Sequence, residues 1–169
     1  MTTPPDVPSV FGPAPLGPLT LRNRIIKSAT FEGASPRGEV TDDLVAFHER
    51  VARGGAAMTT VAYLAVSPEG RTDRHCVLLG DGSLPGLRRL TDAVHAAGAL
   101  ASAQIGHAGP VANSRSNGAP ALSPSRRFGA SGSLTRAVTG ADIARITEDY
   151  RRWPPGSTPS RSTWATTTC

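Results

Sequence analysis

The sequence predicts an α/β fold made of three successive βα units, the beginning of a parallel βα barrel. Short runs of apolar and small residues alternate with segments that have a helical stripe and end at Gly. Each helix would return the chain through a right-handed crossover, which makes the strands parallel. After the first strand, KSATFEG contains neither a G-x-G-x-x-G turn nor a Walker-type lysine, which favours a barrel over a dinucleotide-binding sheet.

The first unit begins after a lead rich in Pro and Thr. Residues 1–9 are expected to be disordered, and the Pro and Gly residues between 13 and 18 predict a small hairpin. The first strand is expected over residues 24–30. Thr41 is suited to cap the following helix, which should stop at the pair Gly54 and Gly55.

The second and third units repeat this order. Residues 56–66, dense in β-branched and small residues, predict a strand, and Ser83 is expected to cap the helix that ends at Gly98. The third strand should occupy 100–109, followed by a long loop and a helix capped by Thr139.

Composition excludes several function classes. The 169 residues carry a net charge of +5 from scattered arginines, so we predict no nucleic-acid partner. No apolar run is long enough to span a membrane, and the N-terminus resembles no secretory signal, so a cytoplasmic location is expected. Cys76 and Cys169 have no metal-ligand spacing, and no metal site is predicted.

The third strand, LASAQIGHAG, carries the main candidate for ligand binding. Gln104 lies within a run of apolar and small residues, where its carboxamide needs a partner. Either it bonds a neighbouring backbone group, or it meets a ligand at the carboxyl end of the strand. His107 is expected to hold the next loop, and Arg71 and Asp73 to be solvated loop charges. The other histidines are expected at the surface: His48, His75 and His95.

Several segments in order give the chain a family resemblance. They are FGPAPLGPLTLRNRIIKSAT, VAYLAVSPEGRT, SAQIGHAG, APALSPS and VTGADIARITEDYRR. The chain resembles the N-terminal part of the old yellow enzyme family of NADH:flavin oxidoreductases. The resemblance covers residues 10–152 and implies the first three βα units of a TIM (βα)8 barrel, incomplete in this chain. It further implies FMN as cofactor, NAD(P)H as reductant, a small-molecule electrophile as substrate and, for a full-length form, a homo-oligomer.

The resemblance also implies where FMN would bind. The segment at the end of the first strand would flank the flavin ring, Tyr63 would pack near it, and Gln104 would bind its pyrimidine edge. Ala29 stands where the family usually has proline, and Phe31 where a hydrogen-bonding side chain usually tunes the flavin, which leaves Thr30 as the hydroxyl there. The implied cofactor-binding residues are Ser28, Ala29, Thr30, Phe31, Tyr63 and Gln104. Catalytic residues stay unassigned.

Residues 153–169 differ in character from the rest. WPPGSTPSRSTWATTTC has no acidic residue and no periodicity, and we expect it to be an unstructured tail. It could be a linker. A second hypothesis is a displaced reading frame after about Arg152, because with suitable synonymous codons residues 155–169 read AGFDAVEVHLGHNYL in the other frame. That string matches the strand that this family places next, including its paired substrate-binding donors.

The expected activity is hydride transfer from NAD(P)H through the flavin to an activated alkene or related electrophile. An alternative enzyme class is the dienoyl-CoA-reductase-like or demethylase branch, which adds an iron–sulfur cluster. The other alternative is an inactive truncated fragment or a small non-catalytic domain. The chain lacks the family's substrate-binding and phosphate-binding half, so we expect weak or no FMN binding and no turnover. Its first and third strands would be exposed apolar edges, prone to aggregate.

Overall fold

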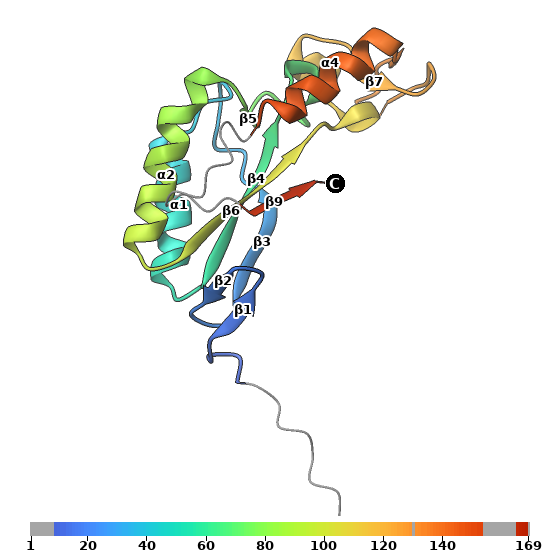
Figure 1. Cartoon of the computed structure of the whole chain (residues 1–169). Helices are drawn as coiled ribbons and strands as arrows, with labels where there is room; N and C mark the ends of the chain where they lie inside the picture. Colours follow the sequence, from blue (N-terminus) through green and yellow to red (C-terminus); the bar gives the residue numbers. More distant parts are fainter. Residues whose placement is uncertain (1–8, 130, 154–164, 169) are drawn as a thin grey trace, which may run out of the picture.

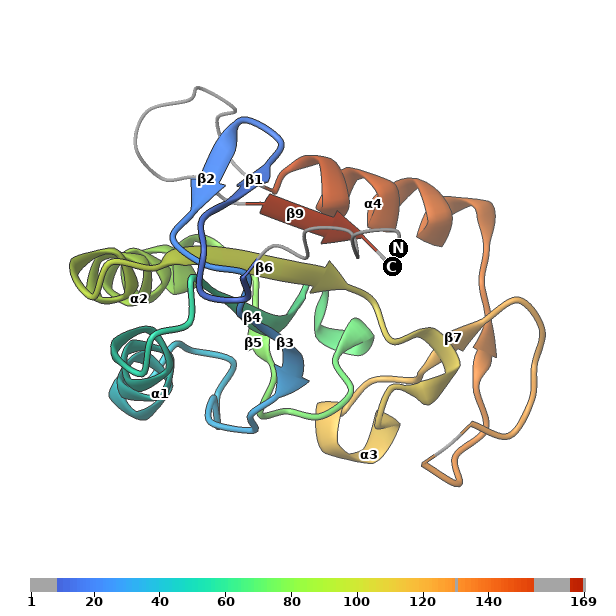
Figure 2. The ribbon, with the colours of Figure 1, turned by 90° about the horizontal axis from the view of Figure 1, so that it is seen from below.

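The computed structural model describes residues 9–129, 131–153 and 165–168. Its main sheet has the order β3 (Ile26–Phe31), β4 (Met58–Ala65), β6 (Leu100–Gly106) and β9 (Ala165–Thr168), and the short β5 (Val77–Leu78) also pairs with β4. All these pairings are parallel. The strands form an open sheet in the described part of the chain and do not close into a barrel (Figures 1 and 2).

The predicted hairpin is confirmed. Strands β1 (Ala14–Leu16) and β2 (Leu19–Leu21) pair antiparallel around a turn in which Gly17 has a φ of 56°. A positive φ of this kind is easily adopted only by Gly. The hairpin lies near the amino ends of the parallel strands (Figure 1).

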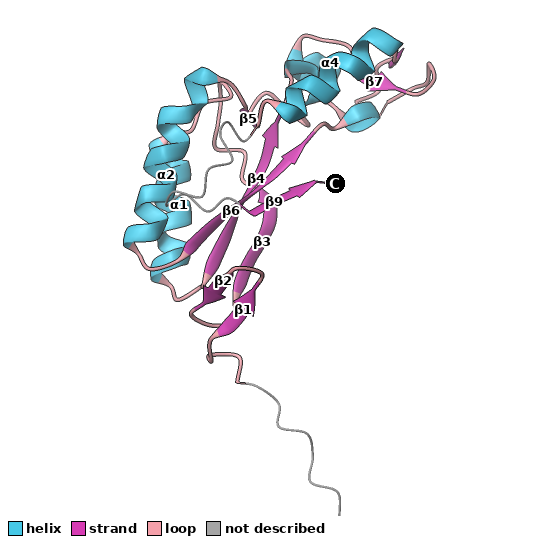
Figure 3. Cartoon of the chain, viewed as in Figure 1, coloured by secondary structure: helices cyan, strands magenta, loops and turns pink. Residues whose placement is uncertain are grey.

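Two helices cover one face of the sheet, namely α1 (Asp42–Arg53) and α2 (Leu84–Ala96) (Figure 3). The predicted cap of α1 is confirmed, since Thr41 Oγ1 accepts a hydrogen bond from Leu44 N at 3.3 Å. Ser83 occupies the predicted N-cap position of α2, but its side chain makes no capping hydrogen bond. The Ser83 hydroxyl instead donates to Gly80 O at 2.8 Å, within the preceding 3₁₀ turn η2 (Asp81–Ser83).

The core lies between these two helices and the sheet. Leu90 and Val94 of α2 pack with Leu44 of α1 and with Val61 of β4, all fully or almost fully buried. His48 is 0% exposed, so the expectation that it lies at the surface is wrong. Its position four residues after the buried Leu44 and four before the buried Ala52 places it on the inward stripe of α1.

The long loop after β6 contains short elements: η3 (Gly109–Val111), α3 (Ser114–Asn117), β7 (Leu122–Ser123) and β8 (Arg136–Ala137), with β7 and β8 paired parallel. Helix α4 (Gly140–Arg151) follows, beyond the carboxyl ends of β4 and β6 (Figure 1). Its predicted capping box is present: Thr139 Oγ1 accepts from Asp142 N at 3.2 Å, and Thr139 N donates to Asp142 Oδ2 at 2.8 Å.

The tail departs from the sequence-based expectation. Residues 165–168 were expected to be unstructured, but they form β9, which pairs with β6 from Ser102↔Ala165 to Ile105↔Thr168. The expectation that the third strand is a free edge is therefore wrong as well. A run of Thr suits an extended strand, and an unpaired β6 edge offers it a ladder of hydrogen bonds. The expected disordered lead lies outside the described residues except for Ser9.

Arg22, just after the hairpin, ties the amino end of the unit together. Its Nη2 donates to Ala52 O at 2.6 Å and to Ala56 O at 2.8 Å, and its Nη1 donates to Ala97 O at 3.2 Å. These carbonyls lie at the end of α1, just before β4, and at the end of α2. A cation at this place satisfies helix-end carbonyls and interacts favourably with both helix dipoles.

Candidate functional site

The candidate site is the sheet face that α1 and α2 leave uncovered. On β6, Ala101, Ala103 and Ile105 pack into the core beneath the helices, so the intervening Ser102 and Gln104 face the other way. Thr60 of β4 shares this face, since its Oγ1 lies 2.7 Å from Ser102 Oγ. The face therefore combines small hydroxyl side chains with one carboxamide.

Strand β3 brings four predicted site residues to the edge of this face. The residues from Ser28 to Phe31 are all exposed. The register with β4 shifts between Lys27 and Thr30, which marks a bulge. Bulges are common next to active sites, where they redirect side chains. Thr30 Oγ1 donates to Ser28 O at 3.3 Å, so its hydroxyl lies against its own strand.

Gln104 lies toward the carboxyl end of β6, half-buried and flanked in register by Thr167 of β9. Its carboxamide can donate one hydrogen bond and accept another at the same time, which matches the alternating edge of a flavin pyrimidine. Strands β3, β4 and β6 run parallel, so the segment from Ser28 to Phe31 and Gln104 belong to one carboxyl-end region. The structure thus brings five of the six predicted residues to the carboxyl-end region of the sheet, with Thr30 and Phe31 lining a pocket on its helix side.

Tyr63, the sixth predicted residue, has a different environment. Its hydroxyl donates to Gly70 O in η1 (Pro68–Gly70), and its ring packs on Gly106, where an added Cβ would lie 3.0 Å from Tyr63 Cδ2. Burial raises the pKa of Tyr63 well above its usual range, so the hydroxyl stays protonated at neutral pH. We conclude that Tyr63 anchors the loop after β4.

Sequence reasoning missed an ionic cluster at the same end of the sheet. Arg145 of α4 forms an ion pair with Glu69 of η1, and Glu69 Oε1 lies 3.8 Å from His107 Nε2. His107 Nδ1 accepts from Gly109 N at 3.0 Å, which fits its expected role in holding the loop. Burial lowers the pKa of His107, so it is mainly neutral at pH 7. The cluster joins helix α4, the 3₁₀ turn η1 and the loop after β6, and no spacing in the sequence signals it.

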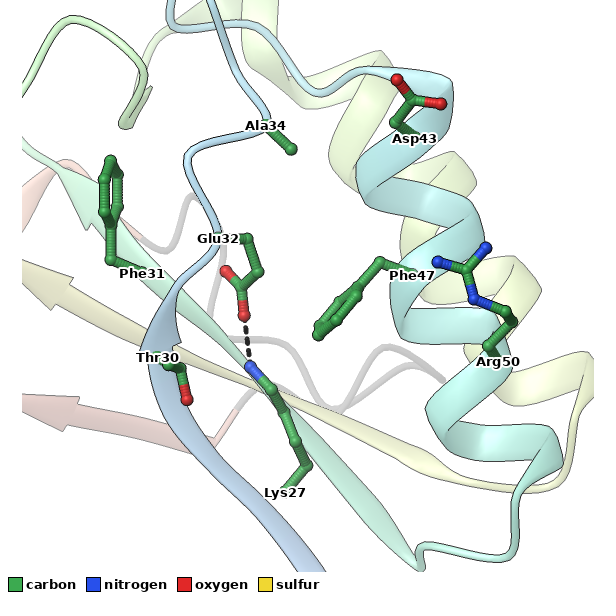
Figure 4. Close-up of a pocket in the computed structure, with 8 residues that line it drawn as sticks. All are labelled: Lys27, Thr30, Phe31, Glu32, Ala34, Asp43, Phe47 and Arg50. Carbon is green, nitrogen blue, oxygen red and sulfur yellow. Dashed lines mark hydrogen bonds and ion pairs between the residues drawn. The ribbon is translucent and has the colours of Figure 1, made fainter.

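A pocket of about 380 Å³ lies between β3 and α1 (Figure 4). Its wall includes the ion pair of Lys27 with Glu32, and Lys27 Nζ lies 5.2 Å from the ring centroid of Phe47. His48 follows Phe47 in α1. Its Nδ1 contacts Thr59 Oγ1 at 2.7 Å, and its Nε2 lies 4.0 Å from Glu32 Oε1. Lys27 marks this as the helix side of β3, opposite the face that carries Gln104. Two of the predicted site residues, Thr30 and Phe31, also line this pocket.

Metal sites, membrane-spanning helices and two of the histidines expected at the surface can be compared with the structure. The part of the chain that the structure describes contains no cluster of His, Cys, Asp and Glu that could hold a metal ion. Among the same residues, no helix is both long and apolar enough to cross a membrane. His75 and His95 are half-buried, and His75 Nδ1 pairs with Asp73 in the loop after β4.

A parallel sheet with crossover helices is common to βα barrels and doubly wound α/β folds, and similarity to known proteins places this chain among the barrels. Residues 9–153 match the NADH:flavin oxidoreductase / NADH oxidase family, and the chain belongs to this family. It is 60% identical, over 153 residues, to a 4,4'-dithiodibutanoate disulfide reductase of Rhodococcus erythropolis. It is 40% identical, over 140 residues, to a metal reductase of Desulforamulus reducens.

Solved structures show the same fold. An old yellow enzyme homologue from Zymomonas mobilis superposes with a TM-score of 0.75 at 26% identity, covering 86% of this chain and 44% of the other. Morphinone reductase in complex with tetrahydroNAD superposes with a TM-score of 0.75 at 24% identity, covering 45% of that chain. The present chain spans 38% of the Rhodococcus relative and 20% of the Desulforamulus one. It therefore corresponds to less than half of each of these proteins.

Proposed function

We propose that this chain supplies one flank of the FMN site of an NAD(P)H-dependent oxidoreductase. The observation that carries the proposal is the position of Gln104 on the uncovered face of β6, at the same carboxyl end as the exposed segment from Ser28 to Phe31. Near Gln104 the face carries small side chains, including those of Ser102 and Thr60, which do not block the approach of a flat ring.

The residues present fit the ring of the cofactor. Gln104 would fix its orientation by donating to a ring carbonyl and accepting from a ring N–H. Phe31, 46% exposed, would cover apolar ring surface at the edge of the sheet, and Thr30 offers a hydroxyl nearby. FMN, when bound, carries hydride from NAD(P)H to the substrate. Tyr63 is not assigned as proton donor, because its hydroxyl is already engaged by Gly70.

The preferred substrate class is an activated alkene, which accepts hydride at its β-carbon and a proton at the neighbouring carbon. A disulfide is the second candidate, favoured by 60% identity to a relative named as a disulfide reductase. In that reaction hydride forms an S–H bond with one sulfur, the S–S bond breaks, and the other sulfur leaves as a thiolate. Both reactions use the same reduced flavin.

Whether the isolated chain binds FMN and catalyses a reaction is a question separate from the role of these residues in the site. We infer that it binds FMN weakly and does not turn over, because the family's substrate donors and phosphate site are expected in βα units that follow these three. The alternative is an inert fragment or a small non-catalytic domain. A cytoplasmic location and a homo-oligomeric full-length form also stay predictions.

The proposal is tested by titrating FMN into the purified chain and following flavin fluorescence. Loss of the two-point amide contact in Gln104→Leu should weaken binding about tenfold, since two hydrogen bonds of about 0.7 kcal/mol each contribute about 1.4 kcal/mol together. Gln104→Glu, which keeps the length but loses the donor, should fall between. His95→Gln, remote on α2, is the control and should match the unmodified chain.

Two outcomes would contradict the proposal or its details. Equal affinity of the unmodified chain and Gln104→Leu would remove Gln104 from the site, and no binding to any variant would favour the inert fragment. NADH oxidation is then measured with an activated alkene and, separately, with an organic disulfide. Turnover by the isolated chain with either substrate would show that the inferred incompetence is wrong.

A further inference from the structure

Strand β3 contains a bulge in the segment that would flank FMN. Lys27 of β3 lies opposite Thr59 of β4, whereas Thr30 lies opposite Val61. Strand β3 therefore advances by three residues while β4 advances by two, so β3 carries one extra residue. An extra residue reverses the alternation of side chains along a strand, and it decides which face of the sheet each later side chain takes.

The ion pair between Lys27 and Glu32 spans this bulge. In a regular strand, residues five positions apart lie on opposite faces and about 17 Å apart, too far for their side chains to meet. Here the bulge, and the end of β3 at Phe31, let the two side chains point toward each other on the helix side (Figure 4). Phe31 points away from the ion pair in the same view.

Lys27 also donates a hydrogen bond to β4 at the bulge. Thr60 lies between the two registered pairs, and its carbonyl oxygen accepts from Lys27 Nζ at 3.3 Å. A bulge locally disrupts the ladder of backbone hydrogen bonds, and a side-chain donor at that place offsets the loss. The Lys27 ammonium group thus joins β4 to the carboxylate of Glu32, which lies beyond the bulge.

His48 and Thr59 connect the ion pair to α1 and β4. Glu32 Oε1 lies 4.0 Å from His48 Nε2, and His48 Nδ1 contacts Thr59 Oγ1 at 2.7 Å. Thr59 is the register partner of Lys27, so these four residues form a closed ring of contacts around the bulge. The side chains of Lys27 and Glu32 are only 16% and 8% exposed, so removal of one partner leaves a nearly buried charge unpaired.

We propose that Lys27 and Glu32 are positioning residues: their ion pair fixes the bulge of β3 and thereby the directions in which Thr30 and Phe31 leave the strand. The consequence for FMN rests on the proposed function, in which this segment flanks the flavin ring. Without the extra residue, the register that starts at Lys27 would bring Thr30 opposite Ala62. Each later side chain of β3 would then take the other face of the sheet.

NMR of the purified chain tests the register directly. The variants are Lys27→Met, Glu32→Gln and the double variant Lys27→Met/Glu32→Leu. The double variant replaces the ion pair by apolar side chains of similar volume, a change that generally preserves folding stability. Interstrand nuclear Overhauser contacts should join Thr30 to Val61 in the unmodified chain. In the variants they should join Thr30 to Ala62 or disappear.

The matched control is Glu49→Leu/Arg53→Met, which removes an exposed ion pair of α1. It should keep the contact between Thr30 and Val61. If the single variants do not fold, the double variant alone decides. Retention of this contact in the double variant, or its loss in the control, would overturn the proposal.

FMN titration separates this inference from the proposed function. If both hold, the double variant should bind FMN about tenfold more weakly than the unmodified chain, because the flanking segment is misplaced. Urea unfolding should show equal stability, a combination that a purely structural role would not produce. No FMN binding by the unmodified chain would contradict the proposed function alone, since the NMR contacts still decide what the ion pair does. Equal FMN affinity in a double variant with a shifted register would overturn the positioning role.

Discussion

At the scale of the residue, burial strongly changes the protonation of His48. It is fully buried against Thr59, with Glu32 4.0 Å from Nε2 and the ammonium group of Lys27 nearby. Burial, and then the positive charge of Lys27, lower the pKa of His48 from 6.5 to about 4. The imidazole is therefore neutral in the folded chain at physiological pH.

This shift predicts a loss of stability in acid. Above pH 6.5 the imidazole is neutral in both states and contributes no pH dependence. Between pH 6.5 and 4 the unfolded chain binds a proton that the folded chain does not, so stability falls as pH falls, by on the order of 3 kcal/mol across the window. Urea unfolding at a series of pH values measures it. His48→Gln should flatten the dependence between pH 6.5 and 4.

At the scale of the element, Arg22 links both helices to the segment before β4 through three hydrogen bonds. Its guanidinium contacts the end of α1, the start of β4 and the end of α2 at once. We predict that Arg22→Ala lowers the free energy of unfolding by about 2 kcal/mol, because charge-assisted hydrogen bonds to helix-end carbonyls are lost. Arg24→Ala, an exposed arginine two residues away, should change it by less than about 0.5 kcal/mol. Chemical denaturation of both variants measures these changes in the free energy of unfolding. Equal changes in the two variants would contradict the role of Arg22.

Local signals in the sequence were sufficient for the elements whose ends carry their own chemistry. The hairpin, the Thr41 cap of α1 and the capping box of α4 depend on residues that are adjacent in the chain, and all three are confirmed. Ser83 was correctly predicted as the N-cap residue of α2, but its hydroxyl bonds within a 3₁₀ turn and does not cap the helix. His48 could have been found, since residues 44, 48 and 52 share one face of α1. The cluster of Glu69, His107 and Arg145 joins three distant segments, so it could not be predicted from local pattern.

The same distinction holds for the candidate site. Gln104 could be selected because a carboxamide within an apolar strand needs a partner, and the structure places it on the face away from the helices. The hydroxyl pair of Thr60 and Ser102 on that face is a cross-strand contact that depends on register. Register was not predictable here because both strands are runs of small and β-branched residues with weak alternation.

At the scale of the whole molecule, the chain contains the first βα units of a larger barrel and a tail of different composition. The family match ends at residue 153, and the chain corresponds to 38% of its 60% identical relative. A displaced reading frame after about Arg152 would explain why the resemblance stops where the composition changes. This hypothesis concerns the gene and can be tested without the protein.

The displaced frame makes specific demands on the codons. Residues 155–169 would read AGFDAVEVHLGHNYL in the displaced frame. In that frame the first two bases of each present codon become the second and third bases of a displaced codon. Arg161 must then use a codon beginning AG, because a CG codon cannot give the required Glu. Ser157, Ser160 and Ser162 must all begin TC to give Phe and Val. Sequencing the gene through and beyond codons 150–169 tests this. A CG codon at Arg161, or an AG codon at any of the three serines, would exclude the frame as written, and the tail would then have to be treated as native. Matching codons, with further βα units continuing in the displaced frame, would assign the oxidoreductase activity to the restored frame.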